Sequence, residues 1–156
     1  MSASAPLTPT AYRERLTPPV IWYVVAVAIG ATFGLVLLPI AGDAGFGLGA
    51  LGGACVGVGL LVLTSAGIEV SQGALRAGRA AIPVQLLGPV TVLDTGEMAR
   101  LRGRDFEPRA YVCQRAWVRT GVQVPVSDPG DPTPYWLISS RRPQLLADAI
   151  EAQRND

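Results

Sequence analysis

Two long stretches without charge constrain this chain most. Asp43 is the only charged residue between Arg15 and Glu69. Each stretch beside it supplies the roughly 20 apolar residues that a helix needs to cross a bilayer, at about 1.5 Å per residue. The sequence therefore predicts a membrane α-helical hairpin of two transmembrane helices over residues 16–68, with spans at about 18–38 and 46–66 and a very short loop between them.

The positions of the arginines predict which side of the membrane the ends face. Arg13 and Arg15 precede the first span, and Arg76 and Arg79 follow the second. Because basic residues are enriched on the cytoplasmic side, we expect a multi-pass protein of the cell membrane with both termini in the cytoplasm. A cleaved signal peptide is the alternative for the first span, although that span is longer than a usual signal core and a second span follows directly.

The segments on either side of the hairpin differ in character. Residues 1–15 begin with Ser, Ala, Pro and Thr without periodicity, and they are predicted to be a disordered leader. Residues 69–156 show alternating patterns and turn signals, which predict a mainly-β partial barrel or bent sheet with a C-terminal helix over 143–153. The expected strands cover 68–70, 74–77, 80–83, 90–94, 97–102, 110–119, 122–126 and 135–139.

Glycines recur along the predicted spans. A spacing of four places them in one stripe of a helix, where another helix can approach closely. The partner is the first span of the same hairpin, a second copy of the chain, or a helix of another protein. The residues expected to pack in this way are Gly30, Gly34, Gly45, Gly49, Gly53 and Gly57.

Arginines also gather at two places in the polar domain. Arg100, Arg102 and Arg104 alternate along one expected strand, so that all three project from one face. Held at the inner leaflet, such residues contact anionic lipid; the alternative is a solvated face balanced by neighbouring acidic residues. The predicted lipid-contact residues are Arg76, Arg79, Arg100, Arg102, Arg104 and Arg109.

A proline-rich loop forms the third candidate site. Its prolines make it rigid, so it is either a recognition surface or a structural crossover in which the aspartates form local turns. The two arginines that follow are candidates to bind an anion or to pair with the aspartates. The candidate interaction residues are Asp128, Asp131, Pro132, Pro134, Tyr135, Trp136, Arg141 and Arg142.

The composition disfavours several classes of function. The chain has no histidine, two cysteines and a formal net charge of +1. It therefore lacks the commonest metal ligand and general base, and no strong field attracts nucleic acid. We expect no catalytic residues, no metal, no cofactor and no nucleic-acid partner.

Four segments resemble those of an actinobacterial family of small two-span membrane proteins of unknown function. They are Tyr12–Leu16, Ala77–Pro83, Asp131–Ser139 and Arg141–Pro143. The resemblance implies a bacterial pleckstrin-homology-like cytoplasmic domain, a fold that does not by itself determine a function. The expected function is a membrane-anchored, non-enzymatic module that recruits a protein partner or contacts anionic lipid. The alternatives are a structural subunit of a membrane complex, or an inner-leaflet enzyme using residues 128–142.

Overall fold

The computed structural model describes residues 12–155. The chain divides into two compact units, one formed by residues 17–65 and the other by the residues up to Leu16 together with those from Ala66 onward. The predicted leader lies outside the described residues as far as position 11. Its last part was wrongly predicted, because strand β1 (Tyr12–Leu16) alternates buried and exposed side chains and belongs to a sheet.

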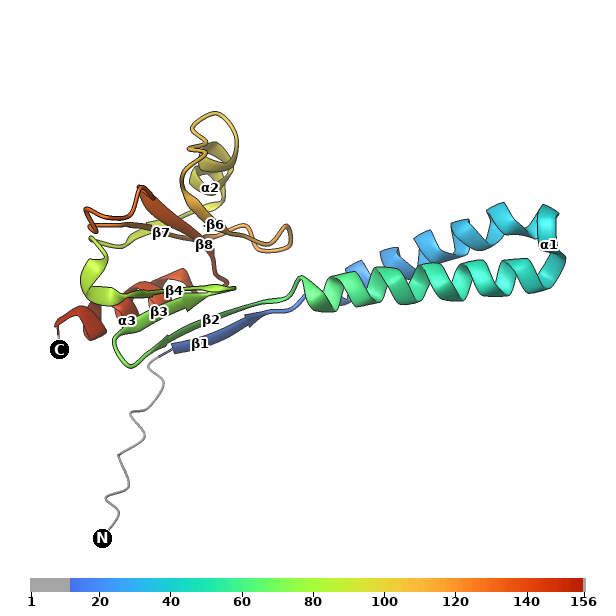
Figure 1. Cartoon of the computed structure of the whole chain (residues 1–156), viewed down its shortest axis with the longest axis horizontal. Helices are drawn as coiled ribbons and strands as arrows, with labels where there is room; N and C mark the ends of the chain where they lie inside the picture. The colour runs from blue at the N-terminus through green and yellow to red at the C-terminus, as the bar shows by residue number, and fades with distance from the viewer. Residues whose placement is uncertain (1–11, 156) are drawn as a thin grey trace, which may run out of the picture. The chain divides into compact units, whose positions relative to one another are not determined.

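The apolar unit consists of one helix assignment, α1 (Val20–Leu63), which is long and apolar enough to cross a membrane. The prediction of a loop between two separate helices is therefore wrong, because the backbone angles are non-helical only at Ala41 and Gly42 within α1. Gly42 has φ 57° and ψ −150°, a region that is essentially restricted to glycine. The chain can therefore reverse without a loop, and Figure 1 shows residues 20–40 (the first half) beside residues 43–63 (the second half).

The sheet that begins with β1 requires this reversal. Leu16 pairs with Ala66 of the neighbouring strand, so the chain leaves the sheet and returns to it at adjacent positions. A straight helix of 44 residues would instead separate its ends by about 66 Å. Only three residues connect Leu16 to α1, and only two connect α1 to Ala66. These connections are too short to bridge that distance.

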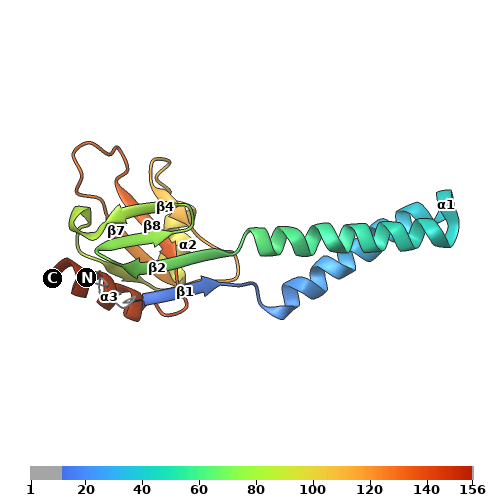
Figure 2. The ribbon, with the colours of Figure 1, turned by 60° about the horizontal axis from the view of Figure 1, so that its bottom comes forward.

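The first sheet is an antiparallel meander of β1, β2 (Ala66–Ser71), β3 (Ala74–Ala77) and β4 (Ala80–Pro83), in that order. Figure 2 shows these strands side by side. Its tight turns use Gly73 and Gly78, which have positive φ. The strands predicted at 74–77 and 80–83 have the same bounds in the structure.

The second sheet has the order β5-β7-β8-β6. It follows the short 3-10 helix η1 (Val84–Leu86) and contains β5 (Thr91–Leu93), β6 (Tyr111–Cys113), β7 (Gly121–Pro125) and β8 (Tyr135–Ser139). The expected hairpin between 110–119 and 122–126 is wrong, because β6 pairs with β8 in parallel and β7 pairs with β8 and β5. The pleckstrin-homology-like assignment stays a prediction.

The strand expected over 97–102 is a helix, α2 (Thr95–Arg102). Its start is fixed by a reciprocal capping box. The amide N of Glu97 donates to Asp94 Oδ1 at 2.8 Å, and the amide N of Asp94 donates to Glu97 Oε2 at 2.9 Å. These bonds satisfy two backbone donors that an uncapped helix would leave unpaired.

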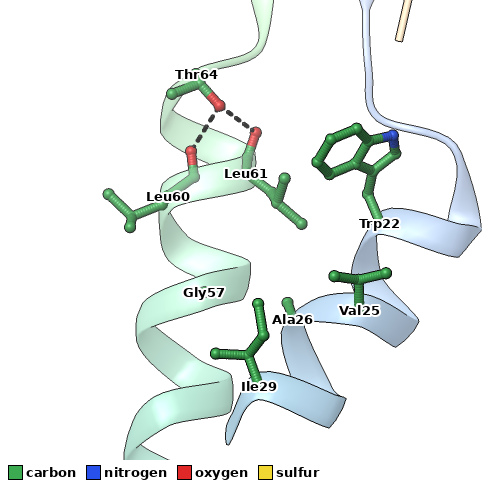
Figure 3. A pocket seen from close by; sticks show the side chains of 8 residues that line it. All are labelled: Trp22, Val25, Ala26, Ile29, Gly57, Leu60, Leu61 and Thr64. Atoms are coloured by element: carbon green, nitrogen blue, oxygen red, sulfur yellow. Dashed lines mark hydrogen bonds between the residues drawn. The ribbon is translucent and has the colours of Figure 1, made fainter. Parts of the chain in front are cut away.

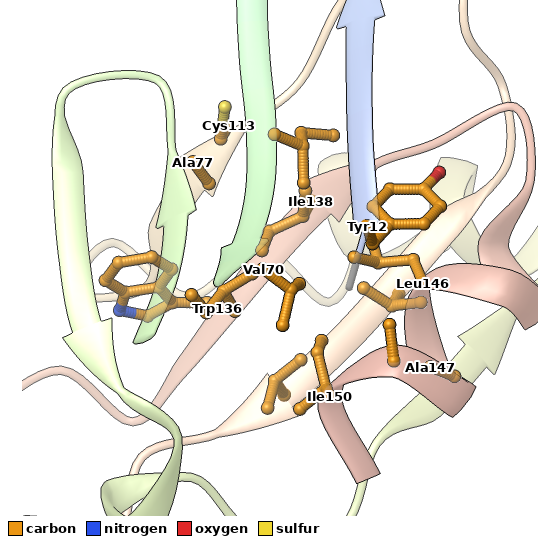
Figure 4. Packing of buried hydrophobic residues seen from close by; sticks show 14 of the residues in the cluster. Tyr12, Val70, Ala77, Cys113, Trp136, Ile138, Leu146, Ala147 and Ile150 are labelled. Atoms are coloured by element: carbon orange, nitrogen blue, oxygen red, sulfur yellow. The ribbon is translucent and has the colours of Figure 1, made fainter. Parts of the chain in front are cut away.

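The C-terminal helix α3 (Pro143–Asn155) begins at the predicted proline and covers the core of the polar unit. Leu146 and Ile150 are fully buried there, and Figure 4 shows them directed toward Val70 of the first sheet and Ile138 of the second. The structure thus confirms the coarser prediction of a long apolar N-terminal helix followed by a mainly-β domain with a C-terminal helix.

Candidate functional site

One end of the first sheet combines exposed arginines with the residues that lead into and out of α1. Arg15 pairs with Gly67, and Gly67 O accepts a hydrogen bond from Gly78 N at 2.9 Å. Arg79 follows in the same turn. Gly78 therefore continues the row of Arg15 across the sheet, and Arg79 lies in the adjacent turn; the side chains of Arg15 and Arg79 are both exposed.

A second row lies two residues further along the same strands. Arg13 pairs with Glu69, and Glu69 pairs with Arg76. Paired residues of antiparallel strands share a face, as do residues two apart, so this row lies on the same face as Arg15. We call Arg13, Arg15, Arg76 and Arg79 the basic face.

The loop after β6 approaches the same end of the sheet. Trp117 Nε1 donates to Leu16 O at 3.3 Å, and a Cβ built at Gly78 would lie 3.4 Å from Cys113 Sγ. Burial raises the pKa of the Cys113 thiol, and the positive charge of Arg115 partly offsets that rise. Arg115 thus adds positive charge near the basic face, whereas Cys113 stays a thiol with little nucleophilic character.

A buried polar cluster joins β1 to the start of α3. Glu14 Oε2 accepts hydrogen bonds from Tyr12 OH at 2.7 Å and from Ser140 Oγ at 2.6 Å, and its Oε1 accepts from Arg141 N at 3.0 Å. Burial raises the pKa of Tyr12 to about 12, so its hydroxyl remains a donor at neutral pH. The cluster fixes the strand that leads into α1 to the N-terminal end of the C-terminal helix.

Glu14→Gln is expected to lower the free energy of unfolding by about 1.5–3 kcal/mol, because three donors converge on a carboxylate that is only 6% exposed. The side-chain NH₂ group of the glutamine is itself a donor, so it could not accept the hydrogen bonds that one carboxylate oxygen now accepts. Denaturant unfolding of the purified protein in mild detergent measures the loss. Glu69→Gln is the matched control: Glu69 is half-buried and accepts from one serine, so its expected change is within about 0.5 kcal/mol. Equal losses would contradict the assignment.

A groove of about 250 Å³ lies between the two halves of α1 where they diverge toward their ends. Figure 3 shows Trp22 on the first half facing Leu61 on the second, and Ile29 directed toward the second half near Gly57. The lining is apolar apart from the indole N–H of Trp22 and the hydroxyl of Thr64, which already donates to Leu60 O at 2.7 Å. The groove therefore offers apolar contact, and its one hydroxyl is already engaged.

The predicted glycine stripe lies between the two halves of α1. A Cβ built at Gly30 would come within 2.5 Å of Ala54 N, and one at Gly53 would come within 2.8 Å of Gly30 Cα. These glycines therefore pack within the chain, between one half of α1 and the other. The stripe residues in close contact with the opposite half, or with residues beside the reversal, are Gly30, Gly34, Gly45, Gly49, Gly53 and Gly57.

The arginines predicted on one strand face are dispersed. Arg100 and Arg102 lie in the last turn of α2, and Arg104 and Arg109 lie in the loop that follows it. Their prediction as one row is wrong because the segment is helical. Three of them have an acidic neighbour within 4.0 Å: the pairs are Arg100 with Glu97, Arg104 with Asp105 and Arg109 with Glu107.

In the proline-rich loop, Asp128 and Asp131 form the local turns that were one of its two expected roles. Asp128 Oδ1 accepts from Gly130 N at 2.9 Å, and Asp131 Oδ1 accepts from Thr133 N at 2.8 Å. The hydrogen bonds from Thr133 lower the pKa of Asp131. Pro132 and Pro134 flank the second turn, so the loop has a rigid local structure.

The residues after this loop have separate environments. Trp136 is 5% exposed, and its ring centroid lies 4.5 Å from that of Tyr111, so Trp136 is a core residue. Tyr135 begins β8 and is half-buried. The backbone N–H groups of Arg141 and Arg142 donate to the buried polar cluster, at Glu14 Oε1 and Ser140 Oγ respectively.

Sequence reasoning missed the buried polar cluster altogether. Tyr12, Glu14 and Leu16 alternate with two arginines, which is the signal of a one-sided strand. The arginines were assigned to the membrane flank instead. Ser140, which lies 126 residues from Glu14 in the chain, carries no local signal at all.

Comparison with known proteins gives one match. The family described as Protein of unknown function (DUF3093) matches residues 11–150, which is most of the chain. No curated protein and no solved structure matches it. The expectation of a family of unknown function is thereby confirmed. The chain belongs to the family described as Protein of unknown function (DUF3093).

Proposed function

We propose that the protein is a two-pass protein of the cell membrane, in which each half of α1 crosses the bilayer and both termini lie in the cytoplasm. Each half contains 21 residues, which corresponds to about 31 Å of helix. This length matches the hydrocarbon core of about 30 Å. The non-helical residues Ala41 and Gly42 then lie at the far surface beside Asp43, the one charged residue of the unit.

The pairing of Leu16 with Ala66 carries this proposal. Both connections to α1 start from neighbouring positions of one sheet, so an α1 that crosses the membrane must cross it twice. The arginines near these connections favour the cytoplasmic side for the sheet. The polar unit is then a domain held at the inner surface by two short connections.

We infer that this domain is a non-enzymatic interaction module that contacts anionic lipid or recruits a protein partner. The exposed basic face supports this role. A pleckstrin-homology-like fold remains part of the proposal, supported by an antiparallel first sheet and a C-terminal helix over the core. The parallel pairing of β6 with β8 is a departure from an all-antiparallel arrangement.

The two alternative functions find less support. A structural subunit would need accessible small residues on α1. Open space surrounds three glycines of this helix, Gly47, Gly52 and Gly59, so they meet that need. The glycines of the stripe, by contrast, already pack within the unit. An enzyme using residues 128–142 would need Asp128 and Asp131 as reactive groups, but their carboxylates accept hydrogen bonds from local backbone N–H groups.

Cysteine labelling in intact cells tests the topology. Starting from a variant with Cys55→Ser and Cys113→Ala, Asp43→Cys places a thiol at the reversal, and Ala152→Cys places one on the exposed side of α3. A membrane-impermeant maleimide is expected to label the first in intact cells and the second only after lysis. Labelling of both positions, or of neither, in intact cells would overturn the two-pass topology.

A further inference from the structure

We propose that the basic face binds the phosphate groups of anionic phospholipids, and that Arg15 and Arg79 make the principal contacts. The inference rests on the proposed two-pass topology and specifies what the domain contacts. The lipid-contact group then consists of arginines of the first sheet and not of the dispersed arginines of the α2 region, residues 100–109.

Chain length places this end of the sheet near the headgroups. Only residues 17–19 separate Leu16 from α1, and only residues 64–65 separate α1 from Ala66. Three extended residues reach about 10 Å. Arg15 and Arg79 are next to residues that these connections join to α1, and the reach of the connections is comparable to the Debye length of about 8 Å at physiological ionic strength.

The charges on the basic face are available to a ligand. Within residues 12–155, Arg13, Arg15, Arg76 and Arg79 form no ion pair. Their face contains one acidic residue, Glu69, whose carboxylate accepts a hydrogen bond from Ser71 at 2.9 Å. A guanidinium presents a fork of donors that matches two phosphate oxygens, so unpaired arginines suit this ligand better than lysines would.

A further positive charge, that of Arg115, lies near the same end of the sheet. Arg115 Nε is buried and has no hydrogen-bond partner in the described part of the chain. Its charge acts on Cys113, which neighbours Gly78 of the β3–β4 turn. Because the Nε atom is buried, Arg115 contributes positive charge near this end of the sheet and no direct contact with a headgroup.

The arrangement favours a membrane surface over a soluble phosphate compound. Arg13, Arg15 and Arg76 occupy two rows on an open, exposed face, separated by two residues or about 6.7 Å, and Arg79 is exposed in the adjacent turn. Such rows can contact several headgroups at once, each basic residue adding a similar contribution. The covalent connections to α1 limit how far this end of the sheet can move from the bilayer, where anionic lipid is concentrated.

Native mass spectrometry of the full-length protein in mild detergent tests the proposal, with phosphatidylglycerol and phosphatidylcholine as probes. Arg15→Gln combined with Arg79→Gln is expected to weaken phosphatidylglycerol binding about 30-fold. Phosphatidylcholine binding should not change. The matched control, Arg100→Gln combined with Arg109→Gln, removes the same charge from the α2 region and should leave phosphatidylglycerol binding within about two-fold of the unsubstituted protein, as for distant sites.

Three results would overturn the headgroup site. They are an equal loss in the control, no loss in the Arg15 and Arg79 variant, and competition by inorganic phosphate as effective as that by phosphatidylglycerol, which would indicate a soluble ligand. Recovery of binding in the corresponding double lysine variant would support a charge effect over misfolding. Maleimide labelling tests the topology independently, so a failure of this site leaves the two-pass topology standing.

Discussion

Replacing Gly121 with alanine is expected to destabilise the β-rich unit by more than about 3 kcal/mol. A Cβ at this position would lie 2.1 Å from Ile138 O and 3.0 Å from Met98 Cε. Ile138 belongs to β8, which is bonded to β7 on one side and β6 on the other. The carbonyl therefore cannot move away without breaking the centre of the second sheet.

Thermal unfolding followed by near-ultraviolet circular dichroism measures this effect, because Trp136 and Tyr111 lie in the same core. Gly67→Ala is the matched control: Gly67 also lies in a strand, but nothing approaches its added Cβ within 4 Å. The control is expected to change stability by less than about 0.5 kcal/mol. Similar melting temperatures for the two variants would show that the second sheet tolerates a side chain at Gly121.

The elements with strong local signals were predictable from the sequence. The absence of charge around Asp43 identified the apolar unit, and alternation with glycine turns identified β3 and β4. The helix α3 followed from Pro143 and its apolar face. In each case the signal lies within one element, so propensity and burial act in the same direction.

Elements that depend on distant partners were mispredicted. Residues 110–119 have the composition of a strand, yet only Tyr111–Cys113 pairs, because β6 joins β8 in parallel. A parallel pair has no connecting turn in the sequence to reveal it. By contrast, the start of α2 was visible as Asp94 followed by Glu97 three residues later, a capping-box pattern that was interpreted as a turn.

The candidate site was partly predictable. Arg76 and Arg79 were expected to contact lipid, and the register adds Arg13 and Arg15 to the same face. That addition could not be foreseen, because it depends on β1 pairing with a strand on the far side of a 49-residue insertion. The sequence predicts residues 12–15 as part of a leader, and a leader contributes to no face of a sheet.

Gly30→Ala is expected to separate the two halves of α1, with a loss of about 1–3 kcal/mol. The added Cβ would lie 2.5 Å from Ala54 N and 2.6 Å from Ala50 O. These are backbone atoms of the opposite half, so no side chain can rotate to make room. Close backbone approach is the source of van der Waals contact between helices in lipid, and the alanine removes it at the centre of the contact.

Gly52→Ala should act in the opposite direction, which makes the comparison decisive. The space around Gly52 is open, and alanine is favoured over glycine inside a helix by about 1 kcal/mol. Thermal unfolding in mild detergent should therefore occur at a lower temperature for Gly30→Ala and at an equal or higher temperature for Gly52→Ala. If both variants unfolded at a higher temperature, helix propensity would dominate, and contact between the two halves would not hold the apolar unit together. A decrease confined to Gly30→Ala would show that the reversal at Gly42 is maintained by packing along the stripe as well as by the connections to β1 and β2.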